Sequence, residues 1–219
     1  MSAQRPSLLQ NEQLPPEPKQ ERSRQKREAL LKAAQSLFAE LGYEAVSIGD
    51  IAGRAGVAVG AFYQHFTSKR QLVLLLMDQL LAHASALIEQ TPPAAIVDAR
   101  TAISALVRQS LQLDWAYAGA YRAWCEVSVY DPELRVLHLQ IEQWSAHRIE
   151  TLLTMLQQAP NARPGVNLAV LSHVISQLFW RLIETPLHEP AQAEQIISSV
   201  SDLIYHALFT DAEADDVTL

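Results

Sequence analysis

Apolar residues recur at helical spacing from Arg22 to Phe209, and this pattern constrains the fold more than any other feature. The helical segments are separated by glycines and by prolines at positions that a first helical turn tolerates, such as Pro132, Pro164 and Pro190. No strand pattern interrupts them. With 49% apolar residues and only 7 glycines among 219 residues, the composition also favours a compact helical protein. We therefore predict an all-α fold of about nine helices.

The amino-terminal third shows four of these helices. Their expected ranges are 22–41, 47–56, 58–65 and 68–90. Ser47 and Asp50 form a capping arrangement at the start of the second helix, and Gly56 ends it. Two short helices around a tight turn, steadied by a third, form a helix-turn-helix, whose second helix can enter the major groove of DNA. The same pattern also suits an ordinary corner in a helical bundle, so periodicity alone leaves both interpretations open.

Five further helices are expected in the remainder of the chain, at 95–113, 115–129, 132–158, 165–184 and 191–209. The last two carry more apolar positions than one pair of helices can bury. Pairing with the same two helices of a second copy would form a four-helix interface, so we predict a homodimer. The residues expected at this interface are Leu171, Ile175, Leu178, Leu182, Ile196, Val200, Leu203 and Ala207.

Charge is distributed unevenly along the chain, whose net charge is -7. Residues 1–70 hold ten Lys and Arg against seven Asp and Glu, whereas residues 71–219 hold seven against seventeen. The basic charge that can displace counterions from phosphate is therefore confined to the amino-terminal third. A protein that compacts DNA should be basic over its whole surface, so the acidic remainder argues against that class.

The sequence gives little support to an enzyme, a metalloprotein or a membrane protein. The chain has no phosphate-binding glycine loop, no nucleophile elbow and no recognised metal-ligand spacing, so we expect no enzyme activity, no metal and no cofactor. The longest apolar run, 72–77, is far shorter than the ~20 residues that a membrane span requires, and no signal-peptide pattern is visible. We expect a cytoplasmic protein in which the single cysteine, Cys125, belongs to the core.

Composition also suggests how the chain is divided. Residues 1–21 contain four prolines and almost no apolar periodicity, which predicts a disordered tail. We expect an amino-terminal domain at 22–72 with its helix-turn-helix at 47–66, a larger helical domain at 73–210 that carries the dimer helices, and a disordered acidic tail at 211–219.

The segment from Leu30 to Leu72 resembles the amino-terminal domain of the TetR (tetracycline-repressor-like) family. The similarity extends without a gap over about residues 24–72, which is roughly a quarter of the chain. It rests on the following residues: Ala33-Ala34, Leu37-Phe38, Gly42-Tyr43, Ser47, Ile51-Ala52, Ala55-Gly56-Val57, Gly60, Phe62-Tyr63, His65-Phe66 and Lys69. After the fourth helix there is no comparable match.

The resemblance implies roles for individual residues. Ser47 is similar to a phosphate-contacting hydroxyl, although a cap alone would also explain it. Gly60 would let the recognition helix approach DNA closely, or would serve tight helix packing. Tyr63, His65 and Lys69 are similar to residues that contact phosphates or bases, against the alternative of a solvated face.

The sequence departs from the common family pattern at Ala58, Val59 and Gln64, where many relatives have serine, lysine and tyrosine. Ala58 cannot cap the third helix and Val59 cannot pair with phosphate, although a small apolar group can pack on a thymine methyl. Gln64 suits a bidentate contact with adenine. A basic cluster at the start of the first helix is a candidate DNA arm or a solvated first turn: Arg22, Arg24, Lys26 and Arg27.

The resemblance further implies a homodimer that reads palindromic operator DNA and encloses a small-molecule effector in the larger domain. Residues expected to line an apolar or aromatic ligand, or alternatively to pack the core, are Trp115, Tyr121, Arg122, Trp124, Trp144, His147, Phe179 and Trp180. We expect ligand binding to release a repressor from its operator, with a ligand-dependent activator as the alternative.

Overall fold

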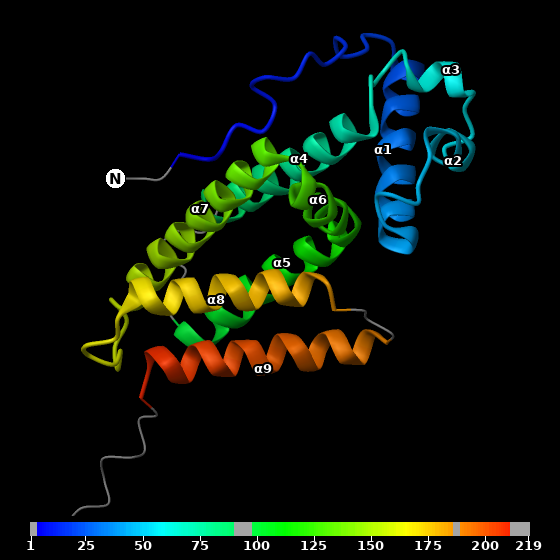
Figure 1. Cartoon of the computed structure of the whole chain (residues 1–219). Helices are drawn as coiled ribbons and strands as arrows, with labels where there is room; N and C mark the ends of the chain where they lie inside the picture. Colours follow the sequence, from blue (N-terminus) through cyan, green and yellow to red (C-terminus); the bar gives the residue numbers. More distant parts are fainter. Residues whose placement is uncertain (1–3, 90–97, 186–188, 211–219) are drawn as a thin grey trace, which may run out of the picture. The chain divides into compact units, whose positions relative to one another are not determined.

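The computed structural model describes residues 4–89, 98–185 and 189–210 (Figure 1). Within these ranges the chain is helical, with an isolated bridge between Ala162 and Phe209 in place of any strand. The helices are α1 (Glu21–Leu41), α2 (Ile48–Arg54), α3 (Val59–Phe62), α4 (Lys69–Glu89), α5 (Ala99–Ala116), α6 (Ala118–Tyr130), α7 (Pro132–Leu156), α8 (Leu168–Ile183) and α9 (Pro190–Leu208). The all-α prediction is confirmed, although α3 is shorter than expected.

Local signals explain where several of these helices begin and end. Gly42 ends α1 with a φ of 84°, a conformation that other residues rarely adopt. The side chain of Asn167 accepts a hydrogen bond of 3.1 Å from the Val170 N–H and so caps α8. Pro132 and Pro190 begin α7 and α9, where the missing N–H is not needed.

The chain forms two compact units. The first, here called the head unit, comprises Arg5–His83 and Trp115–Gln140, and the second, the body unit, comprises Met1–Gln4, Ala84–Asp114 and Ile141–Leu219. The head unit therefore holds α6 in addition to α1, α2 and α3, and α6 packs along α1. Our expected division near residue 72 stays a prediction.

Each unit has its own apolar core. In the head unit the fully buried side chains include Leu30, Phe38, Ile51, Phe62, Phe66, Leu72, Met77 and Trp124. In the body unit the buried side chains include Ile103, Leu111, Ile141, Trp144, Leu153, Ile183, Ile197, Ile204 and Leu208. Burial of this kind contributes about 1.5–3 kcal/mol for each large apolar side chain.

The segment before α1 is not helical, but the structure gives it contacts within the head unit. Leu8 is buried, at 3% exposure, and Arg5 forms an ion pair of 3.0 Å with Asp78. Glu12 forms an ion pair with Arg70 at the start of α4. These contacts differ from those of a free tail. The expected acidic tail at 211–219 lies outside the described residues.

The outer face of α8 and α9 differs in part from our prediction. Ile175 and Val200 are 3% and 6% exposed, so they already pack inside the body unit and leave little surface for a second copy. Val170, Val174 and Leu203 are instead more than half exposed. The other expected interface residues of these helices are half-buried: Leu171, Leu178, Leu182, Ile196 and Ala207. None of the helices described here is long and apolar enough to cross a membrane.

Candidate nucleic-acid interface

The amino terminus of α2 is fixed by a reciprocal cap. The Ser47 hydroxyl accepts a hydrogen bond of 3.1 Å from the Asp50 N–H, and the Asp50 carboxylate accepts one of 2.9 Å from the Ser47 N–H. The hydroxyl also donates to this carboxylate at 2.5 Å, and these bonds lower the pKa of Asp50. The capping role of Ser47 is thus present, and its side chain is exposed.

A tight turn joins α2 to α3. Gly56 has a φ of 68°, and the Val57 N–H donates to the Ala52 carbonyl at 3.0 Å. Arg54 holds α2 against α1, because its guanidinium donates to both carboxylate oxygens of Glu40 at 2.9 Å. These bonds lower the pKa of Glu40 to about 2. The orientation of α2 is therefore set by its cap, the turn and this bidentate pair.

The segment 58–66 has one exposed and one buried face; we call it the recognition segment. Its helix, α3, lacks a side-chain cap at Ala58, and its turns continue through hydrogen bonds from the N–H groups of His65 and Phe66 to the Phe62 carbonyl, each 2.9 Å. Phe62 and Phe66 are fully buried. The exposed residues of the segment are Ala58, Val59, Gly60, Tyr63 and Gln64.

His65 differs from its expected place on the DNA-contacting surface. Its side chain is only 3% exposed, and burial together with the charges of Arg27 and Lys26 lowers its pKa. The backbone carbonyl of His65 accepts a hydrogen bond of 3.2 Å from the Arg27 guanidinium. His65 therefore lies on the buried face of the recognition segment, which it shares with Phe62 three residues earlier.

Arg27 likewise differs from the expected DNA arm. Its guanidinium lies 4.8 Å from the centre of the Phe66 ring, and its side chain is buried. It thus supports the recognition segment from below. Arg22 and Arg24 are exposed as an arm requires, although Arg24 forms an ion pair with Glu21, and Lys26 is half-buried.

Lys69 is half-buried at the start of α4 and turned toward the protein. Its ammonium donates hydrogen bonds to the carbonyls of Tyr43 and Val46, at 2.8 and 2.5 Å, and lies 4.4 Å from the centre of the Tyr43 ring. We expected this side chain to contact phosphate. In the structure its ammonium instead pairs with carbonyls of the turn between α1 and α2.

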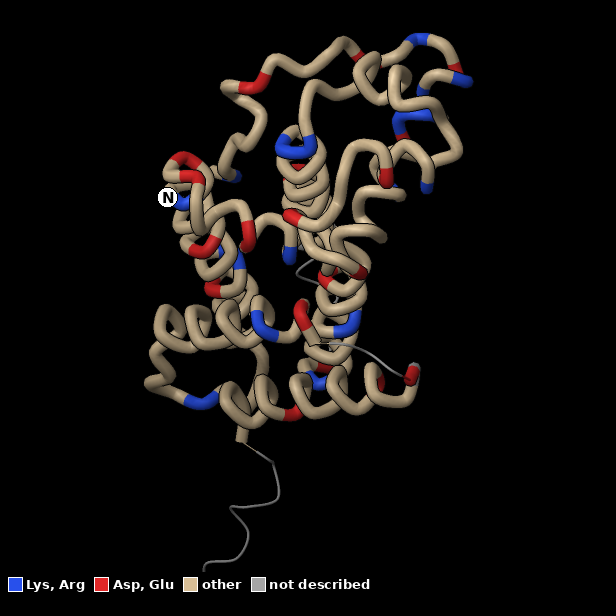
Figure 2. Tube along the Cα trace, turned by 45° about the vertical axis from the view of Figure 1, so that its right-hand side comes forward, with Lys and Arg blue, Asp and Glu red and all other residues tan. Residues whose placement is uncertain are grey.

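The exposed face of the recognition segment is nearly free of charge. Tyr63 and Val59 are 57% and 46% exposed, and a side chain added at Gly60 would meet no atom of the described chain within 4 Å. Packing inside the protein therefore does not explain the glycine. Figure 2 marks the positions of Lys and Arg along the chain in blue and those of Asp and Glu in red. This face offers hydroxyl, amide and small apolar groups, which are groups that read base edges.

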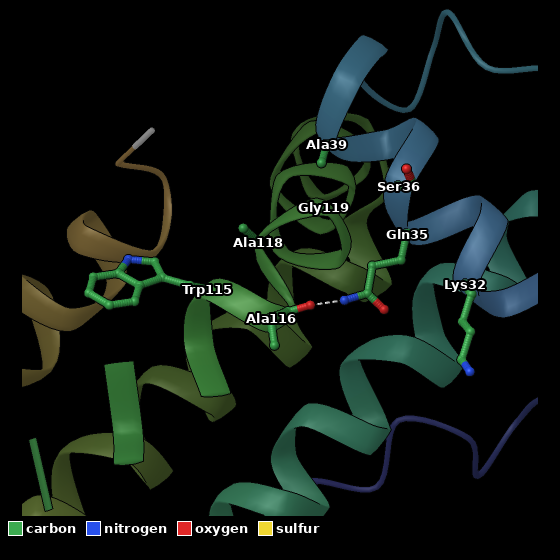
Figure 3. A pocket seen from close by; sticks show the side chains of 8 residues that line it. All are labelled: Lys32, Gln35, Ser36, Ala39, Trp115, Ala116, Ala118 and Gly119. Carbon is green, nitrogen blue, oxygen red and sulfur yellow. Dashed lines mark hydrogen bonds between the residues drawn. The ribbon is translucent and has the colours of Figure 1, made fainter. Parts of the chain in front are cut away.

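A pocket of about 360 Å³ lies in the head unit, where α1 meets the junction of α5 and α6 (Figure 3). The Gln35 amide donates to the Ala116 carbonyl across it, and Lys32 and Trp115 lie at its opposite ends. At Gly119 the helices touch so closely that a side chain would overlap the Gln35 carbonyl oxygen. Of the residues predicted to line a ligand, Trp115 lines this pocket.

The other predicted ligand residues are divided between the units. In the head unit Tyr121 and Trp124 are buried, and the Trp124 indole N–H donates to His138 Nδ1 at 3.0 Å. Arg122 is exposed and donates to the Ala39 carbonyl at 2.9 Å, so it lies against α1. The remaining four belong to the body unit. Trp144 is buried there, and His147, Phe179 and Trp180 are half-buried.

Comparison with known proteins gives matches at two levels. Residues 30–76 match the family model described as "Bacterial regulatory proteins, tetR family". The Transposon Tn10 TetC protein of Escherichia coli is 46% identical over 61 residues, covering 28% of this chain and 31% of that protein. The HTH-type transcriptional repressor Rv3405c of Mycobacterium tuberculosis (strain ATCC 25618 / H37Rv) is 43% identical over 70 residues, covering 32% of this chain and 37% of the repressor. The matched segment thus spans about a third of these relatives.

The structural similarity covers more of the chain than the sequence similarity does. A solved structure described as the molecular basis for control of antibiotic production by bacterial hormones superposes with a TM-score of 0.65 at 24% identity, covering 84% of this chain and 97% of the other. At this identity the likeness concerns the fold. The sequence similarity lies in the segment that carries the capped α2, the turn and the recognition segment.

Proposed function

The chain belongs to the tetR family of bacterial regulatory proteins through its amino-terminal domain, and we propose that it is a sequence-specific DNA-binding regulator of transcription. In this proposal the protein is a dimeric repressor that a small, apolar or aromatic molecule releases from a palindromic operator. The proposed DNA-binding domain comprises residues 22–72, and the remainder up to residue 210 binds the effector and forms the dimer.

The exposed face of the recognition segment is the observation that carries the proposal. Phe62, His65 and Phe66 fix the segment from below, and Tyr63 stands more than half exposed on the opposite side. Together with Ala58, Val59, Gly60 and Gln64 it forms a surface that can enter a major groove. Ser47, at the exposed start of α2, would then lie near phosphate, and Arg22 and Arg24 would approach flanking phosphates.

Fluorescence anisotropy with the DNA upstream of the protein's own coding region tests the proposal. We expect saturable binding that survives unrelated competitor DNA and weakens as salt is raised, because counterions are released from phosphate. Tyr63→Ala should weaken binding about tenfold or more. Tyr130→Ala is a suitable control, because Tyr130 is 80% exposed in the same unit but lies on α6.

Two outcomes would contradict the proposal. One is failure of the wild-type protein to enrich any sequence from a random duplex library. The other is binding that is equally strong on unrelated DNA and indifferent to Tyr63→Ala. Equal losses in the Tyr63 and Tyr130 variants would show that the recognition segment has no special part in binding.

The proposed dimer forms through α8 and α9. Val170 and Val174 follow each other at a spacing of four on α8, and Leu203 is exposed on α9. Large apolar side chains in such a pattern on outer helix faces are typical of an association surface. Two copies related by a twofold axis would present two recognition segments to half-sites about one helical turn apart.

The proposed effector is a small molecule, which agrees with the hormone control named for the structural neighbour. Its contacts would come from the aromatic residues of the predicted ligand set, such as Trp144, Phe179 and Trp180. A coupling free energy of about 1–3 kcal/mol between effector and operator binding changes affinity about 5- to 150-fold. A thermal-shift screen can identify candidates, because a ligand at 100 times its Kd stabilises the folded state by about 2.7 kcal/mol.

A further inference from the structure

The turn between α1 and α2, residues 42–46, has backbone groups that neither helix satisfies. The Gly42 N–H donates to the Phe38 carbonyl of α1 at 3.0 Å, and within the turn the Val46 N–H donates to the Tyr43 carbonyl at 3.4 Å. The N–H groups of Tyr43 and Glu44 and the carbonyls of Tyr43 and Val46 pair instead with side chains from elsewhere in the chain. Unpaired backbone groups of this kind destabilise a fold unless side chains or water pair with them.

Two other helices supply these partners: α6 supplies the acceptor and α4 supplies the donor. Glu126 of α6 accepts hydrogen bonds from the N–H groups of Tyr43 and Glu44, at 2.7 and 3.4 Å. Lys69 of α4 donates to the carbonyls of Tyr43 and Val46. Two donors of the turn are thus bound by a side chain of α6, and two of its acceptors by a side chain of α4.

The Glu126 carboxylate is itself held in place. Arg122, one helical turn earlier on α6, lies 3.3 Å from its Oε1 atom and also donates to the Ala39 carbonyl near the end of α1. A Cβ at position 42 would lie 2.6 Å from the same Oε1 atom, so glycine at this position makes room for the carboxylate. The positive φ requires glycine at position 42, and a side chain there would also displace the Glu126 carboxylate.

The position of the turn matters because Ser47, the cap of α2, follows it directly. α2 and α3 are short, with 7 and 4 residues, so they have little rigidity of their own. We propose that Glu126 is a positioning residue for DNA recognition: through the 42–46 turn it fixes α2 and the recognition segment to α6. This inference rests on the proposed function, because it assigns a role in operator binding.

Hydrogen exchange and operator binding of the full-length protein test the proposal together. In Glu126→Ala we expect the amides of Tyr43 and Glu44 to exchange at least tenfold faster, because a charge-assisted acceptor is lost. Operator affinity should fall about tenfold, with an unchanged salt dependence, since no phosphate contact is removed. Glu126→Gln retains an acceptor oxygen and should restore part of both properties.

Glu133→Ala is the control, because Glu133 is also a head-unit glutamate in an ion pair, with Arg70, but does not touch the turn. Unchanged exchange at Tyr43 and Glu44 in Glu126→Ala would overturn the proposal. So would faster exchange with full operator affinity. If the wild type binds no DNA, the role in recognition is overturned together with the proposed function, whereas the exchange data separately decide whether Glu126 holds the turn.

Discussion

At the scale of single residues, Gly60 separates a role in DNA binding from a role in packing. Its backbone is not in a left-handed conformation, and a Cβ there would meet no described atom within 4 Å. Alanine therefore fits the folded protein. Because glycine inside a helix is less stable than alanine by about 0.5–1 kcal/mol, Gly60→Ala should leave the free energy of unfolding unchanged or raise it slightly.

Gly60→Ala should nevertheless lower operator affinity about tenfold, since the added methyl group stands where the backbone would approach DNA. Titration calorimetry with operator DNA and urea unfolding measure the two quantities. Gly53→Ala on α2 is the control, because Gly53 is also exposed and has open space around it. A loss of stability in Gly60→Ala, or full operator affinity, would contradict the prediction.

Asp114 of the body unit should make stability depend on pH. Burial raises the pKa of this carboxyl from 3.8 to about 7, although the charge of Arg148 opposes the shift. The folded protein thus keeps a proton that the unfolded chain has released above about pH 4. The free energy of unfolding contributed by this group must therefore fall as pH rises from about 4 to about 7, by at most about 4 kcal/mol.

Asp114→Asn removes this titration. We expect the variant to resemble the wild type near pH 4 and to be more stable than the wild type near pH 8, where the native carboxylate is ionised and poorly solvated. Denaturant unfolding at the two pH values measures the difference. A difference in stability that is the same at both would show that Asp114 does not titrate abnormally.

At the scale of helices and segments, local signals in the sequence predicted most of the architecture. The Ser47 and Asp50 pair, Gly42 and the prolines at 132 and 190 mark helix ends because each acts on the backbone within a few residues of itself. The division of each helix into buried and exposed faces was harder to predict. His65 lies three residues after the buried Phe62, and this spacing could have revealed its burial. Val170 and Val174 are four residues apart, and this spacing could have revealed that they share an exposed face.

Some contacts could not be predicted from the sequence at all. Arg122 was assigned to a ligand pocket, but it lies against α1, and Glu126 was not recognised as a functional residue. Glu126 is 83 positions from Tyr43 along the chain, so no periodicity or motif links them. Lys69 was expected to contact phosphate because it is similar to a family lysine with that role, whereas its ammonium donates to two carbonyls of the turn between α1 and α2.

The segment before α1 allows a test at this scale, because composition and structure predict different results. If residues 2–13 were free, their deletion would not alter stability. The structure buries Leu8 and pairs Arg5 with Asp78 and Glu12 with Arg70. We therefore expect the deletion to lower the free energy of unfolding by about 2 kcal/mol, mainly through the loss of Leu8. Thermal unfolding measures it, and Leu8→Ala alone should account for most of the loss.

At the scale of the whole molecule, the proposed function requires two chains, because one recognition segment of a few residues contacts only one half-site. The exposed side chains of Val170, Val174 and Leu203 lie on the helices proposed to associate. The double variant Val174→Glu with Leu203→Glu would bring four carboxylates into the interface of a dimer. Unpaired buried charges are unfavourable enough to separate the two chains.

We expect sedimentation equilibrium to give the mass of one chain for this double variant and of two chains for the wild type. Both substituted positions are exposed in the single chain, so circular dichroism should show unchanged helicity. Operator affinity should fall at least 100-fold, because the second half-site no longer adds to the first. Val136→Glu on α7 is the control, since Val136 is 55% exposed but lies in the head unit. A double variant that stays dimeric would place the dimer contact elsewhere, and a monomer with full operator affinity would remove the need for a dimer in DNA recognition.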